Sequence, residues 1–204
     1  MINIGYDVKG FIKVTDIETN EVVLDTCNQI HYENLSEALA NSLANRGKGQ
    51  LYAMAFGNGG SSVSQTGVIT YYPPNVTGQN AALYSQIYTK IIDDTSVLNT
   101  NAAQNKMSVL HTAGKVYTDI QITCTLGFGE PSGQPIFDNG NNLSNDFMFD
   151  EIGLLGVLGT DSTGATSTRL LSHAVFHPIQ KSLNRQYQVV YTVRIAALTN
   201  QVTI

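Results

Sequence analysis

Two histidines four residues apart, His173 and His177, form the pattern in this sequence that most resembles a metal site. On a helix this spacing would place both imidazoles on one face, as in zinc-binding helices. Pro178 and the β-branched neighbours predict a strand instead, where four residues separate the rings by about 13 Å. Neither His31, His111 nor a cysteine pair supplies a third ligand at a suitable spacing. We therefore predict ordinary half-buried strand histidines, with neither a metal nor a cofactor.

Adjacent carboxylates occur twice, at Asp93-Asp94 and at Asp150-Glu151. Paired carboxylates can perform acid–base chemistry only when both reach the same reacting group. Neighbouring residues on a strand point to opposite faces, so neither pair could clamp one substrate atom from a strand. We expect these carboxylates to be solvated or to lie in an interface.

Three other catalytic patterns are incomplete. The glycine-rich run Phe56-Gly-Asn-Gly-Gly60 follows a strand, but it lacks the Lys and Ser/Thr of a phosphate-binding loop and the spacing of a dinucleotide fingerprint. No serine lies in a Gly-x-Ser-x-Gly elbow, and Cys27 and Cys124 have no local catalytic signature. We interpret both cysteines as reduced structural thiols and predict no catalytic residues, so the protein is expected not to be an enzyme.

The composition excludes several classes of partner. Charged residues make up 13% of the 204 residues, against roughly 25% in ordinary globular proteins. With a net charge of −5 and no basic cluster, nucleic acid binding is disfavoured. No basic segment followed by an apolar run opens the chain, and no apolar run reaches about 18 residues. We expect a soluble protein that is made in a cytoplasm and does not bind membranes.

Most segments predict strands. The clearest spans 115–126, where Val116, Thr118, Ile120, Ile122, Cys124 and Leu126 share one face. A hairpin is expected over 8–26, and further strands over 50–56, 147–158, 170–176 and 186–198; in the last, Tyr187, Val189, Tyr191, Val193 and Ile195 share a face. Residues 83–92 match a helical face, yet their Ile, Tyr and Thr favour a strand, so this segment is ambiguous.

One helix is expected, from Leu35 to Arg46. Asn34 offers a side-chain acceptor for an orphan helix amide, and Glu37 can reach back to complete the cap. Leucines then recur at four-residue spacing, and Gly47 can adopt the left-handed conformation that ends a helix. We expect this helix to pack on a sheet.

Two long polar segments, about 57–80 and 127–145, are expected to be loop arms. The first contains Tyr71-Tyr-Pro-Pro74, which we interpret as an extended aromatic tip. Loops of this length are uncommon without a role. Tyr71, Tyr72, Pro73 and Pro74 are therefore the candidate assembly contacts.

Together these elements predict one mainly β domain over residues 1–204. Its simplest architecture is a β-sandwich or open barrel of antiparallel strands, with one covering α-helix and long polar loops.

Four stretches, taken in order, resemble a family of structural proteins of tailed bacteriophages. They are residues 34–40, 55–60, 149–155 (Phe-Asp-Glu-Ile-Gly-Leu-Leu), and 172–181 followed by 188–195. The third is similar to a Glu-Ile/Val-Gly-Leu strand of tail and baseplate-associated subunits, and the fourth to a Pro-x-x-Lys turn that enters their last long strand. The resemblance implies a β-sandwich that acts by position and brings no catalytic residues.

Four hypotheses follow. The first is a subunit of a symmetric neck, collar, tail or baseplate assembly, in contact with copies of itself and with other virion proteins. The second is a capsid decoration protein, and the third is a host-glycan-binding module that uses its tyrosines. An enzyme is the least favoured. The first hypothesis predicts a chain that is assembled in the host bacterial cytoplasm and located in the virion.

Overall fold

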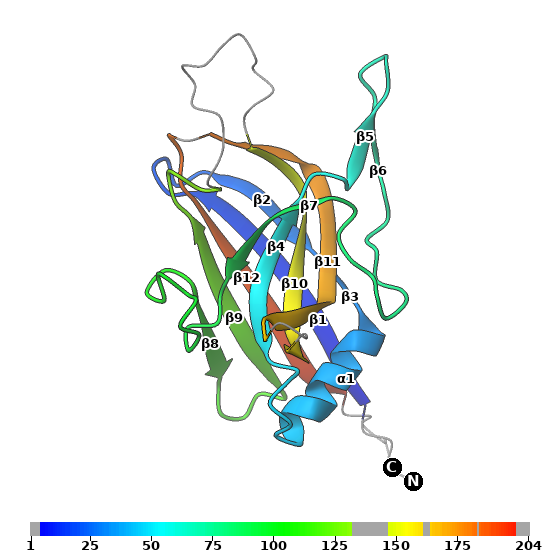
Figure 1. Ribbon diagram of the computed structural model, residues 1–204, viewed down its shortest axis with the longest axis vertical. Coiled ribbons are helices and arrows are strands. Elements are labelled where there is room, and N and C mark those ends of the chain that lie inside the picture. The colour runs from blue at the N-terminus through cyan, green and yellow to red at the C-terminus, as the bar shows by residue number, and fades with distance from the viewer. Residues whose placement is uncertain (1–4, 132–146, 161–163, 183, 199–204) are drawn as a thin grey trace.

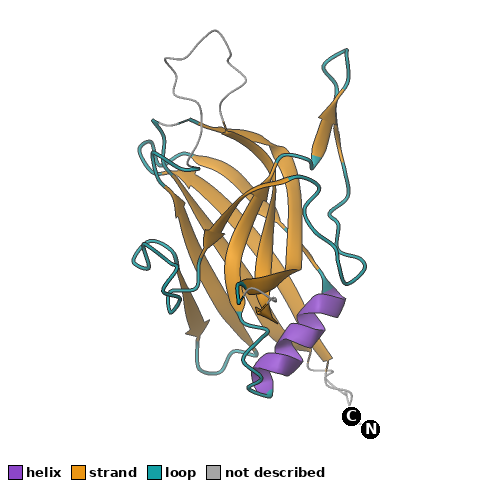
Figure 2. Ribbon diagram, in the orientation of Figure 1, coloured by secondary structure: helices purple, strands orange, loops and turns teal. Residues whose placement is uncertain are grey.

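The computed structural model describes residues 5–131, 147–160, 164–182 and 184–198. These residues form a mainly antiparallel β-sandwich of two five-stranded sheets, with one helix beside it (Figures 1 and 2). The predicted fold class is therefore confirmed, in its sandwich form.

The first sheet has the strand order β2-β1-β12-β9-β8. Its strands are β1 (Gly5–Asp16), β2 (Val22–Cys27), β8 (Lys106–His111), β9 (Tyr117–Leu126) and β12 (Tyr187–Leu198). β1 pairs with β12 along its whole length, whereas β2 covers only the part of β1 from Phe11 to Thr15. Half of one edge of β1 thus has no hydrogen-bonded partner strand among the described residues.

The second sheet has the order β3-β11-β10-β4-β7. Its strands are β3 (Gln29–Ile30), β4 (Leu51–Gly57), β7 (Gln86–Ile91), β10 (Phe147–Thr160) and β11 (Thr166–Lys181). The ambiguous segment 83–92 contains the strand β7, which pairs with β4. The residue types predicted this strand better than the helical spacing did, because side chains of Ile, Tyr and Thr fit a pleated sheet better than a helix.

The core fills the space between the two sheets. Ile122, Cys124 and Leu126 of β9 are fully buried there, as their alternation predicts. The predicted strand was too long at its start, because β9 begins at Tyr117 and Val116, which precedes it, is 57% exposed. The predicted face of the last strand is confirmed from Tyr187 to Val193, all of whose members are buried.

The helix α1 runs from Tyr32 to Leu43, three residues earlier than predicted at both ends. Its N-cap is His31, whose Nδ1 accepts a hydrogen bond from the Asn34 amide. The Asn34 side chain does not cap the helix, because it is buried and donates to the carbonyl oxygen of Leu170 on β11 at 2.9 Å. The helix ends at Leu43 with Ala44 as its C-cap, so Gly47, although left-handed with φ of 67°, does not end it as predicted.

The first predicted loop arm contains a small hairpin. β5 (Ser61–Val63) and β6 (Ile69–Tyr71) form a third, two-stranded sheet that projects beyond one end of the sandwich (Figure 1). Residues 132–145 of the second arm lie outside the described residues.

Candidate assembly surface

The four predicted contact residues lie at the base of the β5–β6 hairpin. The tip is the turn from Ser64 to Val68, which is closed by a hydrogen bond from the Ser64 amide to the Val68 carbonyl at 2.9 Å. Tyr71 is the last residue of β6, and the Tyr72 amide donates to the Gly60 carbonyl at 2.8 Å. The expectation of an aromatic tip was wrong, because Tyr71 already belongs to the hairpin ladder and Gly67 supplies the turn.

Tyr71, Tyr72 and Tyr84 form an exposed aromatic surface, hereafter the tyrosine surface. They are 48%, 42% and 45% exposed. The rings of Tyr72 and Tyr84 lie 5.4 Å apart, and the Tyr84 hydroxyl donates to the Pro73 carbonyl at 2.8 Å. The Tyr71 hydroxyl lies 3.0 Å from His177 Nδ1. The Tyr71 hydroxyl therefore contacts β11, and the Tyr84 hydroxyl binds the segment that follows β6.

Beneath this surface, Glu151 is a fully buried carboxylate. It accepts hydrogen bonds from the backbone amides of Gly59, Tyr84 and Ser85 at 3.1, 2.9 and 2.8 Å. Its Oε2 also lies 3.0 Å from Nε2 of the fully buried His173. One carboxylate on β10 thus anchors the segments on both sides of the hairpin.

The hydrogen-bond partners of His173 determine its tautomer. Nδ1 accepts a hydrogen bond from the Asn75 amide at 2.8 Å, so it carries no hydrogen. Nε2 then donates to Glu151. The ring is neutral in this arrangement, and it connects the carboxylate to the segment between Tyr72 and Tyr84.

The two histidines of the metal-like pattern lie on β11, as predicted, but in different environments. His173 is fully buried, whereas His177 is exposed. Among the described residues, no three His, Cys, Asp or Glu side chains form a group that could hold a metal ion.

Asp150 anchors the hairpin directly. Its Oδ1 accepts from the Gly60 amide at 2.9 Å and its Oδ2 accepts from the Ser61 hydroxyl at 2.5 Å. The pairing of β10 with β11 shifts register between Phe149 and Glu151. Such an irregularity interrupts the alternation of side chains along a strand.

Both members of the Asp150-Glu151 pair therefore reach the same loop, and both are buried. The expectation that they would be solvated or lie in an interface was wrong. A signal for this arrangement was present in the sequence, because an acidic pair inside the otherwise apolar run 147–158 predicts carboxylates that need internal partners.

The glycines before the hairpin allow this close approach. A Cβ atom on Gly57 would lie 2.3 Å from Glu151 Oε1 and 2.6 Å from the Ser85 carbonyl oxygen. The run that resembled a phosphate-binding loop thus directs its amides at carboxylates of its own chain.

The electrostatics of Glu151 follow from these contacts. Burial alone raises the pKa of its carboxyl group, but the hydrogen bonds from His173 and from the three backbone amides outweigh burial. They hold the pKa below its ordinary value, so the carboxylate is charged at neutral pH.

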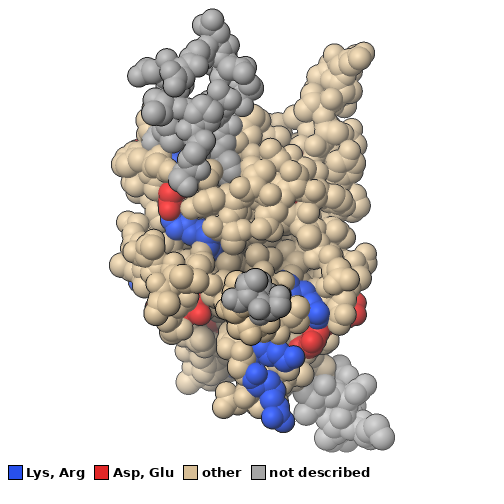
Figure 3. Space-filling view, viewed as in Figure 1, with Lys and Arg blue, Asp and Glu red and all other residues tan. Residues whose placement is uncertain are grey.

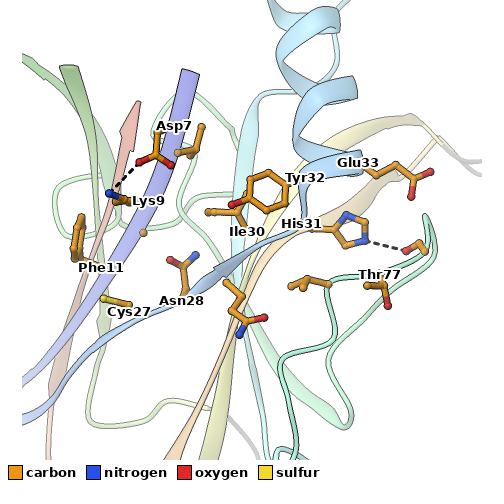
Figure 4. Close-up of a pocket in the computed structure, with 15 residues that line it drawn as sticks. Asp7, Lys9, Phe11, Cys27, Asn28, Ile30, His31, Tyr32, Glu33 and Thr77 are labelled. Carbon is orange, nitrogen blue, oxygen red and sulfur yellow. Dashed lines mark hydrogen bonds and ion pairs between the residues drawn. The ribbon is translucent and has the colours of Figure 1, made fainter. Parts of the chain in front are cut away.

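A second feature, hereafter the β1 groove, lies between β1 and the segment that contains β3 and the start of α1. It is a cavity of about 700 Å³ between β1 at Asp7–Phe11 and the segment Cys27–Glu33. Figure 4 shows the groove as a wedge, with Asp7 and Lys9 on β1 and Tyr32 and His31 at the start of α1. The third wall is the loop Val76–Gly78, whose Gly78 carbonyl accepts from His31 Nε2 at 2.9 Å.

No family model, curated protein or solved structure matches this chain. Within the described part of the chain, the one helix falls short of the length and apolar content that a membrane crossing requires.

Proposed function

We propose that this protein is a non-enzymatic structural subunit of a tailed-bacteriophage virion, within a symmetric neck, collar, tail or baseplate assembly. The observation that carries the proposal is the projecting β5–β6 hairpin together with the polar network that anchors it. A two-stranded hairpin is only marginally stable alone, so a neighbouring surface would stabilise it.

The surface of the hairpin supports this proposal. Residues 61–71 contain no charged side chain, and Figure 3 shows the hairpin as an uncharged column beyond the body. Val63 and Val68 are 64% and 60% exposed. Uncharged surfaces with apolar and tyrosine side chains are common where proteins contact each other.

The buried polar groups also favour a structural role. Asp150, Glu151 and His173 are the residues whose types most resemble catalytic machinery, and their hydrogen bonds hold backbone and hydroxyl groups of this same chain. Their charges and donors thus stabilise the base of the hairpin.

Cryo-electron microscopy of purified particles tests the proposal. We expect density for this chain in a ring at the neck, tail or baseplate. Density distributed over the head would instead favour the alternative of a capsid decoration protein. Absence of the chain from the particles would overturn the virion role altogether.

The tyrosine surface favours one second candidate, a module that binds host glycans. Tyr72 and Tyr84 present neighbouring rings on which a sugar could stack. A glycan panel should then show binding that Tyr72→Ala abolishes and Tyr72→Phe retains. Equal signals for all three proteins would eliminate this candidate.

A further inference from the structure

The backbone at one edge of β1 has hydrogen-bonding groups that no described strand uses. The last bond on the β2 side joins the Asn28 amide to the Gly10 carbonyl at 3.2 Å. Because residues of an antiparallel strand alternate in the direction of their N–H and C=O groups, those of Tyr6 and Val8 point to the same side as Gly10. Val8 lines the β1 groove, and Tyr6 continues the same edge of β1, so a further strand in the groove could pair with both.

The groove has an apolar interior. Val8 and Ile30 line it and also line a second cavity, of about 290 Å³, beneath α1. Leu39, Ile120 and Leu171 line this second cavity from the helix and from both sheets. A strand added to β1 would therefore place its inward side chains against apolar surface.

The β5–β6 hairpin offers a matching edge. The Tyr72 amide bonds to Gly60 and the Val68 carbonyl accepts from Ser64, so the even-numbered residues of this strand face β5. By the same alternation, the N–H and C=O groups of Ile69 and Tyr71 point outward. β5 lies on the side of β11, which leaves this edge of β6 facing away from the sandwich (Figure 1).

We propose that the outer edge of β6 in one copy of this chain pairs with the free edge of β1 in the next copy. This inference rests on the proposed function and names the contact by which the subunits would assemble. The hairpin projects at one end of the long axis, and the start of β1, which lines the groove, lies toward the other end (Figure 1). The contact is therefore head-to-tail, a geometry that builds rings or filaments.

Charge does not oppose this pairing. Charged side chains, especially lysines, are a common device that protects strand edges from association. β6 carries none, and on the groove side Lys9 Nζ lies 3.0 Å from Asp7 Oδ2, so the two charges compensate each other. The exposed rings of Tyr6 and Tyr32, each 70% exposed, would be partly covered by the incoming strand.

Two proline variants of the full chain test the contact. Ile69→Pro and Tyr6→Pro each remove one outward N–H, a donor that the subunit's own ladders do not use. Ile69→Val and Tyr6→Phe are the matched controls, because they retain the amide. Thermal unfolding confirms that each variant folds, and light scattering over a wide concentration range measures self-association.

Cys27 provides an independent readout. It lines the groove and is exposed, whereas the other cysteine, Cys124, is buried. A maleimide should label Cys27 more slowly in assembled wild-type protein than in dilute protein. Loss of one hydrogen bond should weaken self-association by roughly tenfold. Folded proline variants should therefore need about tenfold higher concentration to assemble and should label faster than wild type at the same concentration, while the controls behave as wild type.

Two outcomes would overturn the inference. One is self-association of both proline variants with the concentration dependence of the wild type, and the other is a wild-type chain that stays monomeric at every concentration. Neither outcome bears on whether the chain is present in virions, which microscopy of particles decides separately. A chain that assembles through these edges yet is absent from particles would overturn only the proposed function.

Discussion

Glu151 Oε2 and His173 Nε2 lie 3.0 Å apart on the adjacent strands β10 and β11, and neither side chain is exposed. The histidine is held from its other side by the Asn75 amide, and the carboxylate by three further amides. A buried charge is tolerated when its hydrogen-bonding capacity is filled in this way. The pair therefore fixes where the hairpin and the tyrosine surface sit on the sandwich.

Glu151→Gln should destabilise the fold. The substitution removes the charge and replaces one acceptor oxygen with an NH₂ donor, which would face donor groups such as the Tyr84 amide. We expect the free energy of unfolding to fall by about 3 kcal/mol, because hydrogen bonds to a charged group are lost. Urea unfolding monitored by circular dichroism measures the change. Asp94→Asn, at an exposed carboxylate, is the control and should unfold like wild type; a similar loss in both variants would contradict the prediction.

The stabilisation from Glu151 should depend on pH. Its folded-state pKa is lowered, so the carboxylate contributes fully above the unfolded-state pKa of about 4.3 and loses its contribution as the pH falls through the folded-state pKa. The stability difference between wild type and Glu151→Gln should therefore shrink as the pH falls below about 4. Asp16 and Asp119, whose pKa values are also lowered, titrate in both proteins and cancel in the comparison. A difference that stays constant from neutral to acidic pH would contradict this account.

Strand periodicity predicts the core well but does not predict the site. The alternation of apolar residues in β12 places Tyr187 to Val193 correctly, because burial of one face is a local property of a strand. The partnership of Glu151 with His173 depends on the register of two strands and on an irregularity in one of them. Nothing in the local pattern determines either of these.

The start of the helix shows the same limit. Asn34 is a residue type that is common at N-caps, but its side chain donates to the carbonyl oxygen of Leu170. His31 caps the helix instead. A contact with the distant strand β11 therefore determines which residue caps the helix. The turn of the hairpin was missed for a related reason. The run Tyr-Tyr-Pro-Pro predicts extended backbone, but it does not indicate whether that backbone lies at a turn or at the end of a paired strand.

Substitutions of Tyr72 and Tyr84 should differ in their effects on stability and on assembly. Tyr84→Ala removes a ring that lies 5.8 Å from His173 and the hydroxyl that donates to Pro73, so the free energy of unfolding should fall by about 2 kcal/mol. Tyr72→Ala removes an outer ring and should cost less than about 1 kcal/mol, yet it should reduce incorporation into particles. Thermal melting and quantification of purified particles measure the two effects. If Tyr72→Ala lowers stability and incorporation to the same extent, Tyr72 stabilises the fold instead of forming a contact.

Ile122→Asp tests whether the alternating face of β9 forms the centre of the sandwich. Ile122 is fully buried, with 0% of its surface accessible, and it pairs with Tyr191 of β12. An aspartate there would bury an unpaired charge, so the free energy of unfolding should fall by about 4 kcal/mol or more, and much of the protein should be recovered in insoluble form. Gln121→Asp places the same carboxylate on the neighbouring residue, which points to the opposite face, and should remain folded. Solubility and near-ultraviolet circular dichroism distinguish the two variants, and a folded Ile122→Asp protein would contradict the assignment of the core.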